Sequence, residues 1–189
     1  APINHAIFNK DPYTGVTIIK MSEELDAGPI LRQEKVMLDH TETFGSLHRV
    51  LSELGAKNLL KTLYNINANE EILQNERFVS YAPKIKKLDA KLDFNSNASA
   101  LEARIRGLAP TPGAWFEYKN ERFKVFSAEV VEGNGKAGSI INENLTIACG
   151  KKALNILEIQ RQGKDVMSVS DLLRGFKFKK GDNVNQSTH

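Results

Sequence analysis

Long apolar stretches are missing from this sequence of 189 residues. No run approaches the roughly 18 consecutive apolar residues of a membrane-spanning helix, and no basic and then apolar leader opens the chain as in a secretion signal. Cysteine is scarce too, because Cys149 is the single one. It cannot form a disulfide within the chain, and its apolar neighbours predict a small buried side chain rather than a catalytic thiol. These absences favour a cytoplasmic protein without membrane contact.

Most familiar catalytic motifs are absent as well. The sequence contains no cluster of metal ligands, no glycine-rich phosphate loop, no dinucleotide fingerprint and no nucleophile elbow. Its histidines, His5, His40, His48 and His189, are scattered, so each is expected to be structural or on the surface. No metal site is predicted. Residue types and spacing alone predict no more than part of an α/β domain followed by a basic, β-rich domain.

Charge is distributed unevenly along the chain. Residues 1–76 contain 7 Lys and Arg against 11 Asp and Glu, a net charge of −4, whereas residues 77–189 contain 19 against 12, a net charge of +7. An acidic half joined to a basic half suggests two domains, one of which meets a polyanion. The alternative is that the basic residues only keep the chain soluble.

The first half has the pattern of an incomplete α/β unit. Residues 14–21 and 30–38 are rich in β-branched and apolar side chains, which predicts two strands on either side of a polar loop. Apolar residues at helical spacing between 47 and 63 predict a helix, with Asp39 and Glu42 as a capping box or Thr41 or Thr43 as the cap. Two strands and one or two helices bury a core poorly, so low stability is expected here.

The second half begins after a basic, proline-containing linker. Ser99 and Glu102 form another candidate capping box, and the apolar residues that follow predict a helix ending before the Pro-Thr-Pro-Gly stretch at 110–113. Short strands are expected at residues 114–118, 122–131, 138–141, 145–149 and 154–159, and a short helix at 170–174. Short strands at regular spacing indicate a small barrel.

Several stretches resemble the formyltransferases that use folate. The sequences Thr-Gly-Val-Thr-Ile at 14–18 and Glu-Leu-Asp-Ala-Gly-Pro-Ile-Leu at 24–31 resemble the signature of that superfamily. Ser-Tyr-Ala-Pro-Lys-Ile at 80–85 resembles the end of the catalytic domain of methionyl-tRNA formyltransferases. Residues 105–115 resemble the opening of their carboxy-terminal domain. Residues 171–175, together with Gly181 and Asp182, resemble the end of that domain. The later three motifs, in this order, are the more specific ones.

The resemblance implies a fold and a reaction. The fold is an α/β Rossmann-like formyltransferase domain, incomplete here, followed by an OB-like β-barrel. The implied division is the last part of the catalytic domain at 1–76, a linker at 77–96 and a tRNA-binding OB-like domain at 97–189. The implied reaction transfers a formyl group from 10-formyltetrahydrofolate to the amino group of methionyl initiator tRNA, without a metal, at the start of protein synthesis. The full-length enzyme is expected to be a cytoplasmic monomer.

The resemblance also implies catalytic and folate-binding residues. The family uses an Asn, a His and an Asp, and the Asp corresponds to Asp26, which would orient the imidazole and assist proton transfer. Glu24, Leu25, Asp26 and Gly28 would bind the folate. A plain Asp-x-Gly turn is the alternative for Asp26. The family's Asn and His precede the position of Ala1, so this chain is expected to be inactive alone.

Contact with tRNA is implied for basic residues of the linker and of both ends of the second domain. These are Lys84, Lys86, Lys87, Arg104, Arg106, Arg174, Lys177, Lys179 and Lys180. Phe176 and Phe178 alternate with lysines, so one face of this stretch is expected to be basic and the other to pack inward. A solvated basic strand is the alternative.

Other functions remain open at this point. One is a formyltransferase that acts on a nucleotide-linked amino sugar, and another is a non-catalytic RNA-binding module. A formyltransferase of purine synthesis is less favoured, because it resembles the first motif only.

Overall fold

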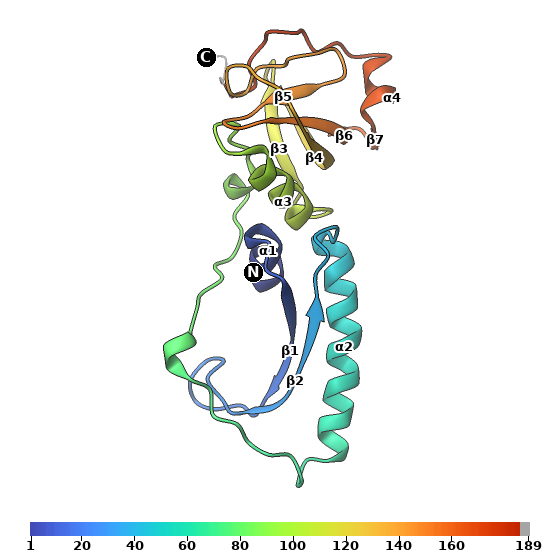
Figure 1. Ribbon diagram of the computed structural model, residues 1–189. Helices are drawn as coiled ribbons and strands as arrows, with labels where there is room; N and C mark the ends of the chain where they lie inside the picture. The colour runs from blue at the N-terminus through green and yellow to red at the C-terminus, as the bar shows by residue number, and fades with distance from the viewer. Residues whose placement is uncertain (186–189) are drawn as a thin grey trace.

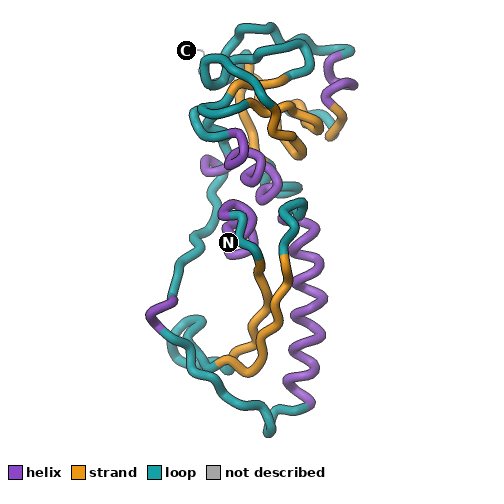
Figure 2. Tube along the Cα trace, viewed as in Figure 1, coloured by secondary structure: helices purple, strands orange, loops and turns teal. Residues whose placement is uncertain are grey.

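The chain forms two lobes joined by a long connection, as the computed structural model shows for residues 1–185 (Figure 1). The first lobe contains α1 (Pro2–Asn9), β1 (Tyr13–Ile19), β2 (Ile30–Met37) and α2 (Phe44–Tyr64). The connection runs along the side of this lobe and includes the 3₁₀ helices η1 (Glu76–Phe78) and η2 (Leu88–Ala90) (Figure 2). No helix among these residues has both the length and the apolar character that crossing a membrane requires.

The first lobe is an antiparallel hairpin with α2 packed on it. The strands β1 and β2 pair from Tyr13 opposite Met37 to Ile19 opposite Ile30, which confirms both predicted strands. Helix α2 contacts both strands, but its predicted apolar stripe is buried only at Leu47 and Leu51, while Leu59, Leu60 and Leu63 are exposed. The helix α1 was not predicted. The apolar cluster of this lobe is small, with Ile7, Leu38, Leu47 and Leu51 at its centre.

The start of α2 decides between the predicted caps. Thr43 is the cap, because its hydroxyl accepts a hydrogen bond from the Ser46 amide at 3.1 Å and the Ser46 hydroxyl accepts one from the Thr43 amide at 3.0 Å. Asp39 precedes the cap residue Thr43 by four positions and therefore does not cap α2. Its carboxylate accepts hydrogen bonds from the amide and hydroxyl of Thr41, which lower the pKa of the Asp39 carboxyl. The prediction of Thr43 was therefore correct, and that of the Asp39–Glu42 box was wrong.

The second lobe contains one sheet with a helix packed against it. Helix α3 (Ala98–Leu108) is followed by β3 (Ala114–Tyr118), β4 (Glu121–Val131), β5 (Thr146–Ala148), β6 (Ala153–Arg161), β7 (Val166–Ser168) and α4 (Val169–Leu173). The strand order is β3-β4-β6-β5, β7 also pairs with β6, and every pairing is antiparallel. No strand pairing joins β3 to β5 within residues 1–185, so the sheet is open.

Two predictions in this lobe were wrong in detail. Helix α3 is capped by Asn97, whose side-chain oxygen accepts a hydrogen bond from the Ser99 amide at 2.9 Å, whereas Glu102 pairs with Arg106. The strand expected at 138–141 is reduced to single bridges at Ser139 and Ile140. Strand β7 was not predicted.

The main apolar core lies in the second lobe. Phe94, Phe116 and Phe123 are fully buried there, and Phe176 and Phe178 pack against them. Ala90, Leu92 and Phe94 belong to this core although they lie in the stretch predicted to be linker. The core also contains Cys149, which is 6% exposed, as predicted for a small buried side chain.

Candidate functional site

The loop between β1 and β2 holds the residues predicted to be catalytic and folate-binding. Its base is closed by a hydrogen bond from the Lys20 amide to the Pro29 carbonyl at 3.0 Å. Within it, Asp26 has a φ of 57°, in the left-handed region that residues with a Cβ seldom adopt. Gly28 is buried against Lys20, and a Cβ at this position would lie 1.7 Å from the Lys20 carbonyl oxygen. Only glycine therefore fits at the end of the loop.

The four predicted residues of this loop lie together at the surface. Glu24, Leu25 and Asp26 are exposed, Leu25 by 92%, and Gly28 is the buried one. Among residues 1–185 the Asp26 carboxylate forms no hydrogen bond or ion pair. The loop therefore presents this carboxylate at the surface of the first lobe.

A segment of the connection supports the loop from outside. The amide of Gln74 donates from Nε2 to the carbonyl oxygens of Asp26 at 2.8 Å and Gly28 at 2.6 Å. Ile72 pairs with Ile30 through backbone hydrogen bonds of 2.8 and 3.0 Å. No role was predicted for this segment, because its sequence has no periodicity and its contacts reach back more than 40 residues.

The histidines that the structure describes are scattered over the chain. His5 lies by the Pro83 carbonyl and Phe8, His48 lies by Phe44, and His40 is exposed. His189 lies outside the described residues. Within the part of the chain that the structure describes, no group of three or more His, Cys, Asp or Glu side chains could hold a metal ion.

The lysines predicted to contact tRNA have exposed side chains that form no ion pair within residues 1–185. Lys84, Lys86 and Lys87 are exposed, and the Lys87 carbonyl accepts a hydrogen bond from the Trp115 indole at 3.1 Å. Near the close of the second lobe, Lys177, Lys179 and Lys180 are exposed as well. The phenylalanines between these lysines point inward, because Phe178 is 7% exposed and Phe176 is half-buried. The predicted alternation is thus confirmed.

The three predicted arginines differ from the lysines. Arg174 is exposed and lies 3.4 Å from Asp171. Arg106 has a side chain only 11% exposed, pairs with Glu102 and donates to the Glu42 carbonyl. Arg104 donates to the Asp89 carbonyl and covers the ring of Phe8. Both α3 arginines are engaged within the protein, which argues against their predicted contact with RNA.

A basic groove that sequence analysis missed lies on the second lobe. It has a volume of about 470 Å³ and is lined by Arg122, Lys124, Gln160, Arg161, Gln162, Gly163 and Lys164, with no acidic side chain among them. Arg161 forms two hydrogen bonds with Glu121, which lower the pKa of the Glu121 carboxyl. The available signal was the spacing of Arg122 and Lys124, which places both on the outward side of one strand.

Comparison with known proteins identifies the family. The family model described as "Formyl transferase" matches residues 1–63, and the one described as "Formyl transferase, C-terminal domain" matches residues 84–177. A methionyl-tRNA formyltransferase of Paramagnetospirillum magneticum is 41% identical over 96% of this chain and 60% of its own length. One of Ruegeria pomeroyi is 39% identical, with the same coverage of both chains. The chain thus spans about 60% of the length of these curated relatives.

Solved structures with the same fold are more distant in sequence. HypX from Aquifex aeolicus in complex with tetrahydrofolic acid has a TM-score of 0.68 at 20% identity, covering 96% of this chain and 35% of its own. WlaRD, a sugar 3N-formyl transferase, has a TM-score of 0.63 at 18% identity, with coverages of 87% and 60%. A methionyl-tRNA formyltransferase from Clostridium thermocellum has a TM-score of 0.56 at 17% identity, with coverages of 89% and 61%. By its two matching domains, this chain belongs to the formyl transferase family.

Proposed function

We propose that the protein is a methionyl-tRNA formyltransferase, which transfers a formyl group from 10-formyltetrahydrofolate to the amino group of methionyl initiator tRNA. The observation behind this proposal is the 41% identity, over 96% of this chain, to a relative that bears this name. The sequence motifs of the linker and of the second lobe support the same assignment, because the wider superfamily shares only the first motif.

Asp26 is the proposed catalytic residue of this chain. A primary amine that attacks a formyl carbon must lose protons, and a carboxylate in reach of the amine or of a bridging water accelerates that loss. The Asp26 carboxylate is exposed and forms no hydrogen bond or ion pair within residues 1–185, while Gln74 binds the backbone carbonyls of Asp26 and Gly28. The group is therefore free to accept a proton at a fixed place.

The same loop fits the folate that the proposal requires. Leu25, 92% exposed, offers an apolar contact, and the backbone around Asp26 and Gly28 offers polar groups beside it. A pterin is flat and has hydrogen-bonding edges, so this combination suits it. Solved neighbours named as complexes with tetrahydrofolic acid or 5-N-formyl-THF support the proposal. Bound 10-formyltetrahydrofolate would supply the formyl carbon. Glu24, in the same loop, would be a further contact to the folate.

We assign tRNA binding to phosphate contacts rather than to reading of bases. The exposed basic side chains are Lys84, Lys86, Lys87, Lys177, Lys179 and Lys180, together with Arg174, which lies 3.4 Å from Asp171. Neutralisation of phosphates supplies much of the affinity of proteins for nucleic acids. The predicted contacts of Arg104 and Arg106 have less support, because both side chains bind within the protein.

The finer architecture belongs to this proposal as well. We interpret the second lobe as an OB-like barrel, with bridges from Lys91 to Trp115 and from Ile140 to Ile147 extending its two edges. The proposed division remains 1–76, 77–96 and 97–189, with the end of the linker packed on the second lobe through Leu92 and Phe94. A cytoplasmic monomer without membrane contact is the proposed form of the enzyme at full length.

The test is the substitution Asp26→Asn in the protein as its gene encodes it. Formylation of methionyl initiator tRNA by 10-formyltetrahydrofolate should fall by about 10²–10⁴-fold, the usual contribution of acid–base catalysis. Glu23→Gln, an exposed carboxylate of the same loop, is the matched control and should keep the rate. A rate within a few-fold for Asp26→Asn would contradict the role of this residue. No formylation by the unaltered protein would contradict the function.

A second candidate is supported by the sugar formyltransferases among the solved neighbours. The same assay with a dTDP-linked amino sugar distinguishes the two substrates. Formylation of the sugar alone would replace tRNA as the proposed substrate. Binding of tRNA without formylation of either compound would favour the RNA-binding module.

A further inference from the structure

A single carboxamide outside the β1–β2 loop binds the loop backbone at two points. Gln74 lies 48 residues after Asp26 in the chain, yet its Nε2 donates to the carbonyl oxygens of both Asp26 and Gly28, at 2.8 and 2.6 Å. A carboxamide nitrogen has two hydrogens, and each is used here. Because both partners are acceptors, only the orientation with nitrogen toward the loop satisfies them.

The loop needs such support because its own residues provide little. Glu24, Leu25, Asp26 and Ala27 are exposed, and the Asp26 carboxylate has no partner in residues 1–185. Asp26 also has a φ of 57°, a conformation that persists only where the surroundings impose it. The direction of its carboxylate therefore depends on how the backbone on either side of Ala27 is held.

Gln74 is itself anchored close to the loop. Ile72, two residues earlier, exchanges backbone hydrogen bonds of 2.8 and 3.0 Å with Ile30, just after the loop. Glu71 forms an ion pair of 2.6 Å with Lys20, just before the loop. The segment 71–74 therefore contacts both ends of the loop and its centre, and the Gln74 carboxamide reaches the centre.

We propose that Gln74 is a positioning residue that aims the Asp26 carboxylate at the reacting amine by fixing the loop backbone at Asp26 and Gly28. The inference rests on the proposed function, since it assumes that Asp26 acts in proton transfer. It assigns a role in that function to the connection between the lobes. Gln74 touches neither substrate nor donor in this role and acts through Asp26.

The test compares Gln74→Met with Gln33→Met in the protein as its gene encodes it. Methionine is close to glutamine in length but has no donor. Gln33 is the matched control, because its Nε2 donates to the Thr17 hydroxyl at 3.0 Å on the same hairpin, away from the loop. Misplacement of a catalytic group by about 1 Å lowers rates by about 10²-fold, so Gln74→Met should lower kcat by about 10–100-fold with KM for methionyl-tRNA within a few-fold. Gln33→Met should leave both constants near those of the unaltered protein.

Two further measurements separate positioning from a general structural effect. Amide hydrogen exchange at residues 22–28 should become faster in Gln74→Met and stay unchanged in Gln33→Met. In a background that contains Asp26→Asn, Gln74→Met should cause little further loss of kcat, because residues that act as a unit are not additive.

The outcomes distinguish this inference from the proposed function. If Asp26→Asn abolishes activity but Gln74→Met leaves kcat or the loop exchange unchanged, the role of Gln74 is wrong and the function stands. If Gln74→Met lowers kcat equally with and without Asp26→Asn, Gln74 acts elsewhere and the inference is wrong. If Asp26→Asn retains the rate, the catalytic role of Asp26 fails first and the positioning role fails with it.

Discussion

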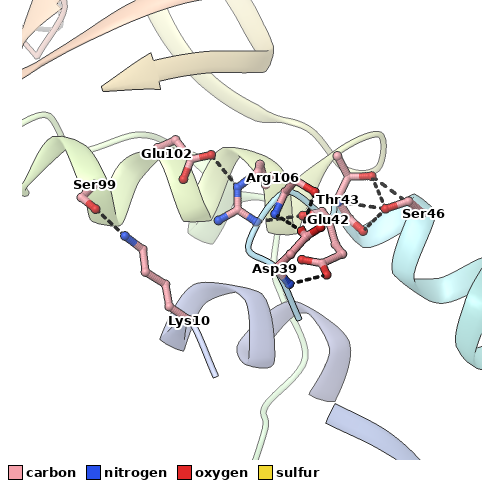
Figure 3. A network of polar contacts seen from close by, with 9 residues as sticks. Lys10, Asp39, Glu42, Thr43, Ser46, Ser99, Glu102 and Arg106 are labelled. Atoms are coloured by element: carbon pink, nitrogen blue, oxygen red, sulfur yellow. Dashed lines mark hydrogen bonds and ion pairs between the residues drawn. The ribbon is translucent and has the colours of Figure 1, made fainter. Parts of the chain in front are cut away.

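Arg106 of α3 donates a hydrogen bond through Nη1 to the backbone carbonyl of Glu42, 2.8 Å away, and thereby joins the second lobe to the first (Figure 3). The same guanidinium pairs with Glu102, one turn earlier in α3. Beside it, the Gly45 amide donates to the Ala109 carbonyl at 3.0 Å, and the Asn4 side chain donates to the Gly107 carbonyl at 2.7 Å. The lobes are therefore held together by directional polar contacts at α1, α3 and the start of α2.

Removal of this guanidinium should loosen the junction. The substitution Arg106→Ala should lower the free energy of unfolding by about 1–3 kcal/mol, because it leaves the Glu42 carbonyl and Glu102 without their charged partner in a mostly buried place. Urea titration measures this loss. The control is Arg49→Ala on the exposed side of α2, which should change stability by less than about 0.5 kcal/mol. Equal effects of the two substitutions would show that the Arg106 contact contributes nothing at the junction.

The two lobes should differ in local stability. The cluster at the centre of the first lobe consists of Ile7, Leu38, Leu47 and Leu51, whereas the second lobe contains the much larger aromatic core. Amide exchange in the 189-residue chain should be fast in β1 and β2 and slow in β4 and β6, since local opening is easiest where few apolar contacts are lost. Equal protection of both lobes in a chain shown to be monomeric by sedimentation would contradict this expectation.

Sequence periodicity predicted β1 to β6, because their pattern is local, but it missed β7 and added a strand at 138–141 that is only isolated bridges. β3 matches its expected bounds, and the turn at Lys119 and Asn120 has the positive φ values of a tight hairpin. Helix caps were harder, because several polar residues precede each helix and only one can reach the free amides. Thr43 and Asn97 are the caps because they lie immediately before the first helical residue.

Long-range contacts could not be predicted from one sequence. The apolar residues of α2 were expected to form a buried stripe, yet Leu59, Leu60 and Leu63 face outward because the hairpin covers only one side of the helix. Arg106 was expected to bind RNA, since nothing local shows that Glu42 lies beside it. The candidate site shows the same limit: Asp26 was predicted from a motif, whereas Gln74 reaches the loop from a stretch without any pattern.

The thiol of Cys149 should respond to pH through its burial. Desolvation raises the pKa of this thiol from 9.0 to about 11. Between these values the folded chain retains a proton that the unfolded chain has lost, so stability falls as pH rises, by at most about 1.4 kcal/mol per pH unit. Cys149→Ala should remove this part of the slope. Parallel stability curves for the two proteins from pH 9 to 11 would show that the thiol does not titrate as expected.

The close approach of Gly28 to Lys20 predicts a strong effect of one methyl group. In Gly28→Ala the Cβ would overlap the Lys20 carbonyl oxygen, which is backbone and has little room to move. The loop must then shift, which should lower formylation by at least about 10-fold if Asp26 is catalytic. Gly55→Ala in α2 is the control for the substitution, since a Cβ there would meet only the Val16 side chain at 3.5 Å, an ordinary contact distance. Full activity of Gly28→Ala would contradict the described loop.

The basic groove predicts a second contact region for RNA. Lys124→Ala combined with Lys164→Ala removes two ammonium groups from its lining and leaves the Arg161–Glu121 pair intact. If the groove receives a phosphate, the affinity for tRNA should fall and its log–log dependence on salt should become shallower by roughly 1 for each lost contact. An unchanged slope would place the groove outside the interface.

The linker lysines provide the decisive test of phosphate binding. Replacement of Lys84, Lys86 and Lys87 by alanine should weaken the binding of initiator tRNA and lower the log–log salt slope by about 3 if each lysine neutralises one phosphate. Lys57→Ala with Lys61→Ala, on the exposed part of α2, removes positive charge from the first lobe and serves as the control. Comparable losses in both variants would indicate a general effect of net charge. Loss confined to the linker variant, and equal for initiator and elongator tRNA, would show contact with the phosphate backbone, so that discrimination between the two tRNAs must come from residues other than these lysines.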